Sequence, residues 1–371
     1  MFRKTLLLLL VPLLFTSSFA QVARIQSLLD SLRIAGNYPG LSLSIVKDGQ
    51  VISLASGFND KETNLALKPA DRLLQGSVGK TYVSAIALLL VKQGKLDLDR
   101  KVSSYLGKYD WYHRLPNAAD ITVRMLMNHT SGVMRYEFKD QFLKDLTASP
   151  GRHWEPHELL NYILDEKASF RAGEGWEYSD SNYILLGMIL EAITGRPYSD
   201  LLKMEILEPL RLSETFTSEG RKLNGLAQGY AGVDNEFGGK DRMIGPDGLF
   251  IINPQFEWTG GGIYSTTADL ARWGKLLYEG KLIDTGLLLS SAVPAKLGRD
   301  TKYGLSVIIK PSPIGVCYGH SGFFPGYMTE MYYYPAYKMC IALQSNSSDF
   351  KNLRISLARC MAAIAKEASL L

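Results

Sequence analysis

Cysteine and charge of one sign are both scarce in this 371-residue chain. Three cysteines are too few for the disulfide framework of a small secreted domain, and none belongs to a CxxC pair of the kind that binds zinc. The formal net charge is only +4, which excludes a strongly basic surface for nucleic acid. We therefore expect no metal, no cofactor and no nucleic-acid partner.

Long apolar runs are also missing, except at the N-terminus. Residues 1–20 combine a basic start (MFRK), an apolar run over Leu6–Phe15 and small residues up to Ala20. This order is typical of a secretory signal peptide, whereas a membrane anchor would need about 20 apolar residues. We expect export to the periplasm or the medium, cleavage after Ala20, and no stable membrane anchor afterwards. Removal of the two basic residues lowers the net charge from +4 to +2.

Strand patterns occupy both ends of the mature chain. The segment LSLSIVKDGQVISLASG places two apolar runs around Asp48-Gly49, which predicts a hairpin. Similar runs recur near the C-terminus, at Tyr303–Ile309, Gly315–Gly319, Tyr327–Tyr334 and Met339–Gln344. Helical patterns accompany them at Val22–Ile34 and Phe350–Ala368. We expect one antiparallel sheet built from both termini and flanked by helices.

The middle of the chain carries mostly helical patterns broken by loops. The predicted helices are Val78–Gln93, Val123–Asn128, Pro156–Lys167, Tyr183–Thr194, Tyr198–Ile206 and Thr267–Tyr278. This arrangement predicts an α/β (α+β) fold with a large helical region inserted into a sheet domain. We expect a single domain over residues 21–371, with a sheet subdomain at about 21–75 and 262–371 and a helical subdomain at about 76–261. An active site is expected where the two meet.

Three segments place a serine three residues before a lysine, a spacing that brings both side chains to one face of a helix. The pairs are Ser44 and Lys47, Ser77 and Lys80, and Ser348 and Lys351. The first pair lies on a predicted strand, where an odd spacing puts the side chains on opposite faces. The last lies in a polar stretch that leaves its lysine solvated. The middle pair opens a helix that is apolar nearly all round, which predicts burial.

Burial suggests a chemical role for the middle pair. An ammonium group loses hydration in an apolar interior, so burial lowers the pKa of Lys80 toward the range of a base. Ser77 lies at the predicted helix N-terminus, where N–H groups favour developing negative charge. The structural alternative is that Ser77 caps the helix and the Lys80 ammonium reaches solvent.

Other patterns have simpler explanations. QGSVGKT has Leu74 where a phosphate-binding loop needs glycine, and GHSGF has Phe323 in place of the last glycine of a nucleophile elbow. His153 and His157 have helical spacing, but an intervening proline predicts a helix start and no metal site. We expect His129 to make structural hydrogen bonds.

The cysteines are expected to remain unpaired where strand order constrains them. Cys317 and Cys340 fall on predicted strands with the Tyr327–Tyr334 strand between them. Two strand spacings are about 9.6 Å, which exceeds the reach of a disulfide. This argument leaves Cys360 unconstrained.

Motifs in chain order resemble those of the serine β-lactamase and penicillin-binding-protein superfamily. They are Ser77-Val78-Gly79-Lys80, then NHTSG, Tyr178-Ser179-Asp180 followed by NYILLG, Gly260-Gly261-Gly262 with STTADLARW, and His320-Ser321-Gly322 followed by FFPGY. The similarity is greatest to the class C β-lactamase-like group, which includes D-alanyl-D-alanine carboxypeptidases, D-aminopeptidases and esterases. It covers nearly the whole mature chain and implies a β-lactamase/transpeptidase-like fold.

The resemblance also implies roles for single residues. Ser77 would be the acylated nucleophile, Lys80 its partner base, and Tyr178 the residue that passes a proton to the leaving group and later helps to activate water. The segment His320–Gly322 would take the place of the Lys-Thr-Gly element on a strand beside the nucleophile. The backbone N–H groups of Ser77 and Phe323 would form the oxyanion hole.

Two positions depart from the family pattern. His320 replaces a lysine that meets the substrate's carboxylate, so that charge is lost or present only on a protonated imidazole. Asp180 stands where asparagine is usual, and its carboxylate can accept a hydrogen bond from an amine but cannot donate one. Both changes suit an esterase, an amidase or an aminopeptidase better than an efficient β-lactamase.

The resemblance therefore implies a serine hydrolase that cleaves an ester or amide bond through a Ser77 acyl-enzyme, as a peptidase or esterase. Its substrates would be small molecules or short peptides, including peptidoglycan fragments and β-lactams. One alternative is a true class C-type β-lactamase or D-Ala-D-Ala carboxypeptidase. Another is a catalytically idle sensor module, although such a protein ought to have lost the serine or the lysine.

Overall fold

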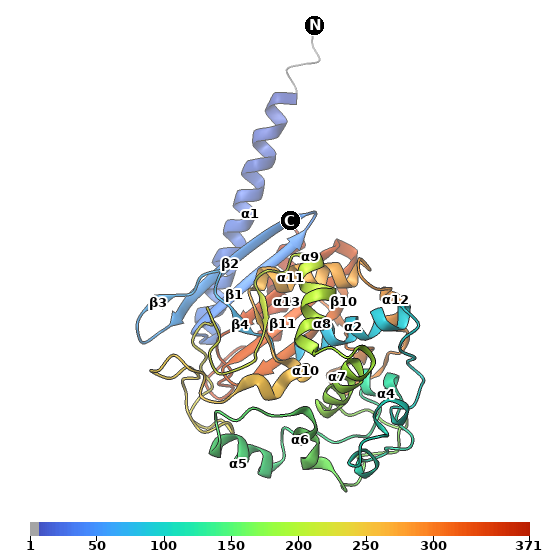
Figure 1. The fold of residues 1–371 in the computed structure, drawn as a ribbon. Helices are drawn as coiled ribbons and strands as arrows, with labels where there is room; N and C mark the ends of the chain where they lie inside the picture. The colour runs from blue at the N-terminus through green and yellow to red at the C-terminus, as the bar shows by residue number, and fades with distance from the viewer. Residues whose placement is uncertain (1–6) are drawn as a thin grey trace.

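A nine-stranded antiparallel sheet forms the centre of the computed structural model, which describes residues 7–371 (Figure 1). The strand order is β3-β2-β1-β12-β11-β10-β9-β8-β7. The bounds are β1 Gly40–Lys47, β2 Gln50–Asp60, β3 Leu65–Ala66, β7 Val293–Pro294, β8 Lys302–Tyr303, β9 Ile308–Ser312, β10 Gly315–Phe324, β11 Tyr327–Tyr334 and β12 Met339–Ser345. The N-terminal strand β1 pairs directly with the C-terminal strand β12. The prediction of one antiparallel sheet built from both termini is thus confirmed.

Helices cover both faces of this sheet. Helices α1 (Leu7–Gly36) and α13 (Leu357–Ala368) pack on one face, and α11 (Thr267–Tyr278) packs on the other (Figure 1). The alternation of side chains along β1 serves both layers. Leu41, Leu43 and Ile45 join the core under α1 and α13, whereas the Ser44 hydroxyl bonds to Thr267 of α11 at 2.9 Å.

The helical region packs beside the α11 face of the sheet. Its elements are η1 Gly76–Gly79, α2 Lys80–Lys92, α3 Ser103–Leu106, η2 Tyr112–Arg114, α4 Val123–Met127, α5 Asp140–Ala148, α6 Pro156–Leu160, η3 Asn161–Ile163, α7 Ser181–Thr194, α8 Tyr198–Leu202, η4 Lys203–Leu207, α9 Glu208–Leu210, η5 Pro254–Glu257 and α10 Trp258–Gly261. Most residues of helices α2 and α7 are buried, and the two helices contact each other. A small sheet of β4 (Leu73–Leu74), β6 (Ile263–Ser265) and β5 (Thr215–Thr217) lies beside η1. Helix α12 (Thr285–Ser290) and the turn η6 (Pro335–Tyr337) complete the fold.

Local signals predicted several elements well. The β1–β2 hairpin turns at Asp48 and Gly49, whose φ angles of 48° and 78° are both positive, as a type I′ turn requires. Helix α11 and strand β11 have the predicted bounds.

The prediction of one continuous strand over Tyr303–Ile309 is wrong, because the chain leaves the sheet between β8 and β9. Leu305 N–H donates to Leu288 O at 2.9 Å, and Ser306 N–H donates to Met127 O at 3.1 Å. Ser306 has a φ of 64°, which no strand residue adopts. The backbone groups at this point therefore bind α12 and the last residue of α4 instead of a neighbouring strand.

Two predicted helices are too long. The helix expected over Pro156–Lys167 ends at Leu160 and continues only as the turn Asn161–Ile163. The C-terminal helix begins at Leu357 and not at Phe350, because the Ser356 side chain caps it by accepting from Arg359 N–H at 3.4 Å. The seven residues before it form a loop.

The proposed cleavage site after Ala20 lies within α1, and the first six residues of the leader lie outside the described residues. Export therefore stays a prediction. Between residues 7 and 371, no helix has the length and hydropathy to cross a membrane.

Strand β11 separates Cys317 on β10 from Cys340 on β12, and both are free buried thiols, which confirms the strand order expected for them.

Candidate active site

Ser77 and Lys80 meet where the turn η1 leads into α2. Lys80 Nζ lies 3.1 Å from Ser77 Oγ. The turn packs against β10 so closely that a Cβ on Gly76, which has a φ of +54°, would lie 2.7 Å from Phe323 N. A Cβ on Gly322 would collide with Gln75 O. Glycine at these two positions thus lets the backbone of Ser77 and that of Phe323 lie side by side, as the expected oxyanion hole requires.

Lys80 is fully buried and carries its charge. Its Nζ contacts three oxygen atoms, which are Ser77 Oγ, Gly260 O and Asp180 Oδ1. Burial by itself would lower the pKa of Lys80, but Asp180, together with Tyr178 and Glu257, more than offsets this effect, so the pKa lies above its ordinary value. The expectation that burial makes Lys80 a base is therefore wrong for the free protein. Lys80 is an ammonium that donates hydrogen bonds.

Asp180 belongs to a buried cluster of charges that includes two residues the sequence analysis missed. Arg135 Nη2 lies 3.7 Å from Asp180 Oδ2, and Arg135 Nε donates to Glu137 Oε1 at 2.5 Å. Burial raises the pKa of Asp180, but the opposing effect of Lys80, Glu137 and Arg135 is larger in sum. The pKa of Asp180 therefore lies below its usual range. Burial and Asp180 hold the pKa of Glu137 well above its usual range. Asp180 is therefore an ionised partner of Lys80, and it is not free to accept an amine without competition.

Tyr178 lies over the same pair. The Lys80 Nζ is 5.0 Å from the centre of the Tyr178 ring, and the Tyr178 hydroxyl is buried without a hydrogen-bond partner in residues 7–371. Burial raises the pKa of Tyr178 despite the opposing charge of Lys80, so the phenol is neutral. An unpaired buried hydroxyl is unusual in a merely structural tyrosine.

His320 is buried and neutral. Its Nδ1 lies 2.5 Å from Ser321 O, which can only accept, so Nδ1 carries the proton and Nε2 accepts from the Tyr303 hydroxyl at 2.8 Å. Burial and the nearby Lys80 lower the pKa of His320 to about 3. Of the two alternatives left open by the sequence, the structure favours the first: the positive charge at this position is lost.

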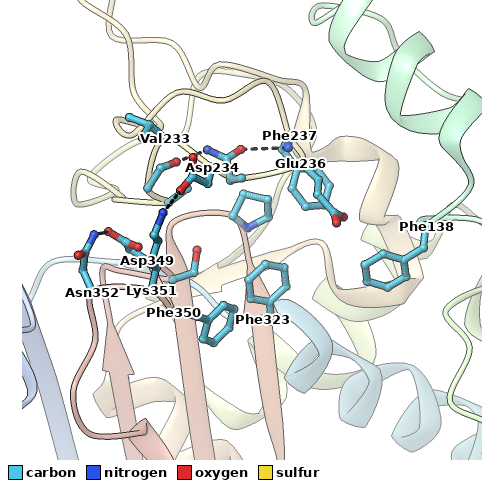
Figure 2. A pocket seen from close by; sticks show the side chains of 15 residues that line it. Phe138, Val233, Asp234, Glu236, Phe237, Phe323, Asp349, Phe350, Lys351 and Asn352 are labelled. Atoms are coloured by element: carbon cyan, nitrogen blue, oxygen red, sulfur yellow. Dashed lines mark hydrogen bonds and ion pairs between the residues drawn. The ribbon is translucent and has the colours of Figure 1, made fainter.

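A cavity of about 690 Å³ opens beside Phe323 (Figure 2). Its apolar wall is made by Phe138, Val233, Phe237, Phe323 and Phe350. A charged rim faces it, in which Lys351 Nζ lies 2.7 Å from Asp234 Oδ2. The wall comes mostly from the loops 231–237 and 348–352, so an apolar surface adjoins the expected oxyanion hole.

The sequence profile of the family described as Beta-lactamase matches residues 25–366. The chain belongs to the beta-lactamase family. It is a serine hydrolase of the β-lactamase-related kind, acting on amide or ester bonds, and its motif order and fold confirm the resemblance stated above.

Individual relatives of this beta-lactamase-family protein are distant. It is 26% identical to penicillin-binding protein 4* of Bacillus subtilis over 345 residues, which cover 88% of this chain and 72% of that protein. The D-amino acid amidase of Ochrobactrum anthropi SV3 shares the fold with a TM-score of 0.80 and 23% identity, over 95% of this chain and 99% of that one. A penicillin-binding protein of Bacillus halodurans superposes with a TM-score of 0.72 and 22% identity, over 91% and 99%.

The fold of this family member brings together one or two residues from each of four motifs and leaves the competing pairs apart. These residues are Ser77, Lys80, Tyr178, Asp180, Gly260 and His320. Ser44 Oγ bonds to Ser53 and Thr267, away from Lys47, and Lys351 pairs with Asp234 at the surface. His153 precedes α6, so it does not share a helix with His157. His129 Nδ1 accepts from Ser179 N–H at 3.3 Å, a structural contact as expected.

Proposed function

We propose that this serine hydrolase cleaves small esters or amides whose acyl part carries an apolar or aromatic group, through an acyl-enzyme on Ser77. The observation that carries the proposal is the continuity of the site. Ser77 Oγ lies beside Lys80, the turn that holds Ser77 packs against the Phe323 backbone, and the Phe323 side chain lines the apolar cavity. Burying an aromatic group there stabilises a complex by about 1.5–3 kcal/mol.

In the acylation step Ser77 Oγ attacks the carbonyl carbon and the bond to the leaving group breaks. The Ser77 proton passes to Lys80 as Lys80 gives a proton to Tyr178, and Tyr178 gives its own proton to the leaving group. Lys80 thereby remains charged beside Asp180 throughout. The N–H groups of Ser77 and Phe323 hold the oxyanion.

The acyl side is assigned to the cavity because of the direction of β10. Tyr178, which must reach the leaving group, packs near His320, with ring centres 6.2 Å apart. Phe323 lies three residues further along the strand, about 10 Å away at 3.3 Å per residue. A substrate that places its leaving group by Tyr178 therefore directs its acyl group toward the cavity. The D-amino acid amidase was solved with L-phenylalanine amide and with D-phenylalanine, which makes aromatic amino-acid amides useful first substrates here.

The direct test is an intact-mass time course with the p-nitrophenyl ester of phenylacetic acid, repeated with benzylpenicillin. The ester is expected to add one phenylacetyl group to the peptide that contains Ser77. Benzylpenicillin is expected to react far more slowly, because neutral His320 offers its carboxylate no charge. Absence of any ester adduct would refute the proposal, and equally fast acylation by penicillin would show that the charge is not needed.

Phe350→Ala tests the cavity. The Phe350 side chain is 65% exposed, so its removal leaves the core intact, but it shortens the apolar wall. We expect kcat/KM for the phenylacetyl ester to fall about tenfold, equivalent to about 1.4 kcal/mol. The p-nitrophenyl ester of acetic acid has no aromatic group to bury, so its kcat/KM should change little. Phe216→Ala, at an exposed phenylalanine on β5, is the matched control. An equal loss for both esters would contradict an acyl pocket.

A further inference from the structure

Glu257 is a partly buried carboxyl group for which the acylation step has no role. It is the last residue of η5 and directly precedes α10. Its side chain makes no hydrogen bond or ion pair with any residue between 7 and 371, although the other carboxylates of the cluster, Asp180 and Glu137, are paired with Lys80 and Arg135. Among these described residues, Glu257 is therefore the carboxyl group of this cluster that no cation holds, and its oxygens are not among the buried atoms without a partner.

The glycines of the GGG motif bring Glu257 close to the nucleophile. A Cβ built on Gly261 would lie 3.0 Å from Glu257 Oε2 and 2.6 Å from the carbonyl carbon of Gly76. The carboxylate and the backbone leading to Ser77 therefore both lie against the same position of Gly261, which only a residue without a Cβ leaves open. A Cβ on Gly260 would lie 3.5 Å from the same Oε2, and the Gly260 carbonyl accepts from Lys80.

The backbone next to Glu257 is strained. Trp258 has φ 38° and ψ −115°, a conformation that residues with a side chain rarely adopt. Strain of this kind persists where the surrounding structure holds it, and it is concentrated at functional sites. Here it directs the chain from η5 into α10 at the residue after the carboxylate.

The charges around Glu257 set its proton affinity. Three charged residues shift the pKa of Glu257: Lys80 from α2, Asp180 from the start of α7, and Arg135 from the loop after the NHTSG segment. Glu257 in turn raises the pKa of Tyr136 from the same loop. Burial and Asp180 raise the pKa of Glu257, Lys80 and Arg135 oppose them, and the result is about 8. Lys80 and Tyr178 both keep their protons at neutral pH, whereas a fraction of Glu257 is an ionised carboxylate there.

We propose that Glu257 is the general base that activates water to hydrolyse the Ser77 acyl-enzyme, an inference that rests on the function proposed above. The water oxygen bonds to the acyl carbon while one water proton passes to Glu257. The bond from that carbon to Ser77 Oγ then breaks, Oγ takes a proton from Lys80, and Lys80 recovers one from Glu257. The acid product leaves, and Glu257 is again a carboxylate.

The test measures deacylation alone. Protein loaded with the phenylacetyl ester at pH 5 is freed of excess ester and shifted to pH 6, 7 or 8, and the loss of the acyl mass is followed. In the unmodified protein the rate should rise about tenfold per pH unit and level off near pH 8, because the ionised fraction of Glu257 rises in that way. Glu257→Gln should lower the rate at pH 8 at least about 100-fold, abolish this pH dependence and accumulate acyl-enzyme.

The variants separate this inference from the proposed function. Glu257→Asp keeps a carboxylate and should recover part of the rate, whereas Glu208→Gln, at an exposed carboxyl on α9, should behave like the unmodified protein. If the unmodified protein forms no Ser77 adduct, the proposed function itself fails. If the adduct forms but Glu257→Gln loses it at the normal rate with the normal pH profile, only the role of Glu257 is overturned.

Discussion

Replacing Ser77 by alanine is expected to lower kcat/KM for the phenylacetyl ester at least about 10⁴-fold and to remove the acyl-protein mass altogether. The reason is that Ser77 Oγ is the atom that forms the covalent bond, and loss of a nucleophile leaves only the acceleration from binding and the oxyanion hole. The measurement is steady-state hydrolysis together with intact mass.

The folded state should not change with this substitution. Ser77 is only partly buried, and its hydroxyl bonds to Lys80, which keeps Gly260 and Asp180 as partners. Thermal unfolding should therefore match that of the unmodified protein. Ser290→Ala, at an exposed serine at the end of α12, is the control for handling and purity. Ester hydrolysis retained in Ser77→Ala would assign the chemistry to another residue.

Asp180→Asn is expected to lower the free energy of unfolding at pH 7 by about 3 kcal/mol. The substitution removes the counter-ion of a fully buried ammonium group. A buried charge without a partner destabilises the folded state by more than the ion pair had stabilised it. The Lys80 pKa should fall, since the largest of the interactions that oppose burial is then lost. Urea unfolding at pH 7 measures the loss.

Asp99→Asn is the matched control, because Asp99 pairs with Arg124 at the surface with 69% of its side chain exposed. An exposed ion pair contributes no more than about 1 kcal/mol. Equal losses in the two variants would contradict a buried, charged Lys80.

The pH dependence of the free energy of unfolding follows from the pKa shifts of Asp180 and Lys80. The folded pKa of Asp180 lies below its usual value, so its contribution is complete above about pH 4 and is lost as the pH falls through the folded pKa. The folded pKa of Lys80 lies above its usual value, so its contribution is complete below about pH 10 and is lost as the pH rises through the folded pKa. The contribution of the Asp180–Lys80 pair to the free energy of unfolding should therefore be constant across neutral pH and shrink in acid.

Much of the fold could be predicted because its signals are local. Asp48-Gly49 specifies a hairpin turn through its own backbone preferences, and the apolar spacing of Thr267–Tyr278 specifies a helix whatever lies around it. The motifs also placed Ser77, Lys80 and Tyr178 in one site, and the structure brings them together. Where prediction failed, as between Tyr303 and Ile308, the backbone groups bind residues far away in the sequence.

The sequence by itself thus determined the family, the antiparallel sheet joined from both termini and the candidate nucleophile with its lysine. Only the tertiary structure decided their electrostatics. Lys80 is charged because Asp180, a hundred positions later, lies against it, and His320 is neutral because burial and Lys80 oppose its protonation. The apolar cavity and the place of Glu257 likewise depend on distant loops. Electrostatic energies and cavity shape depend on distances in space, which spacing along a chain does not encode.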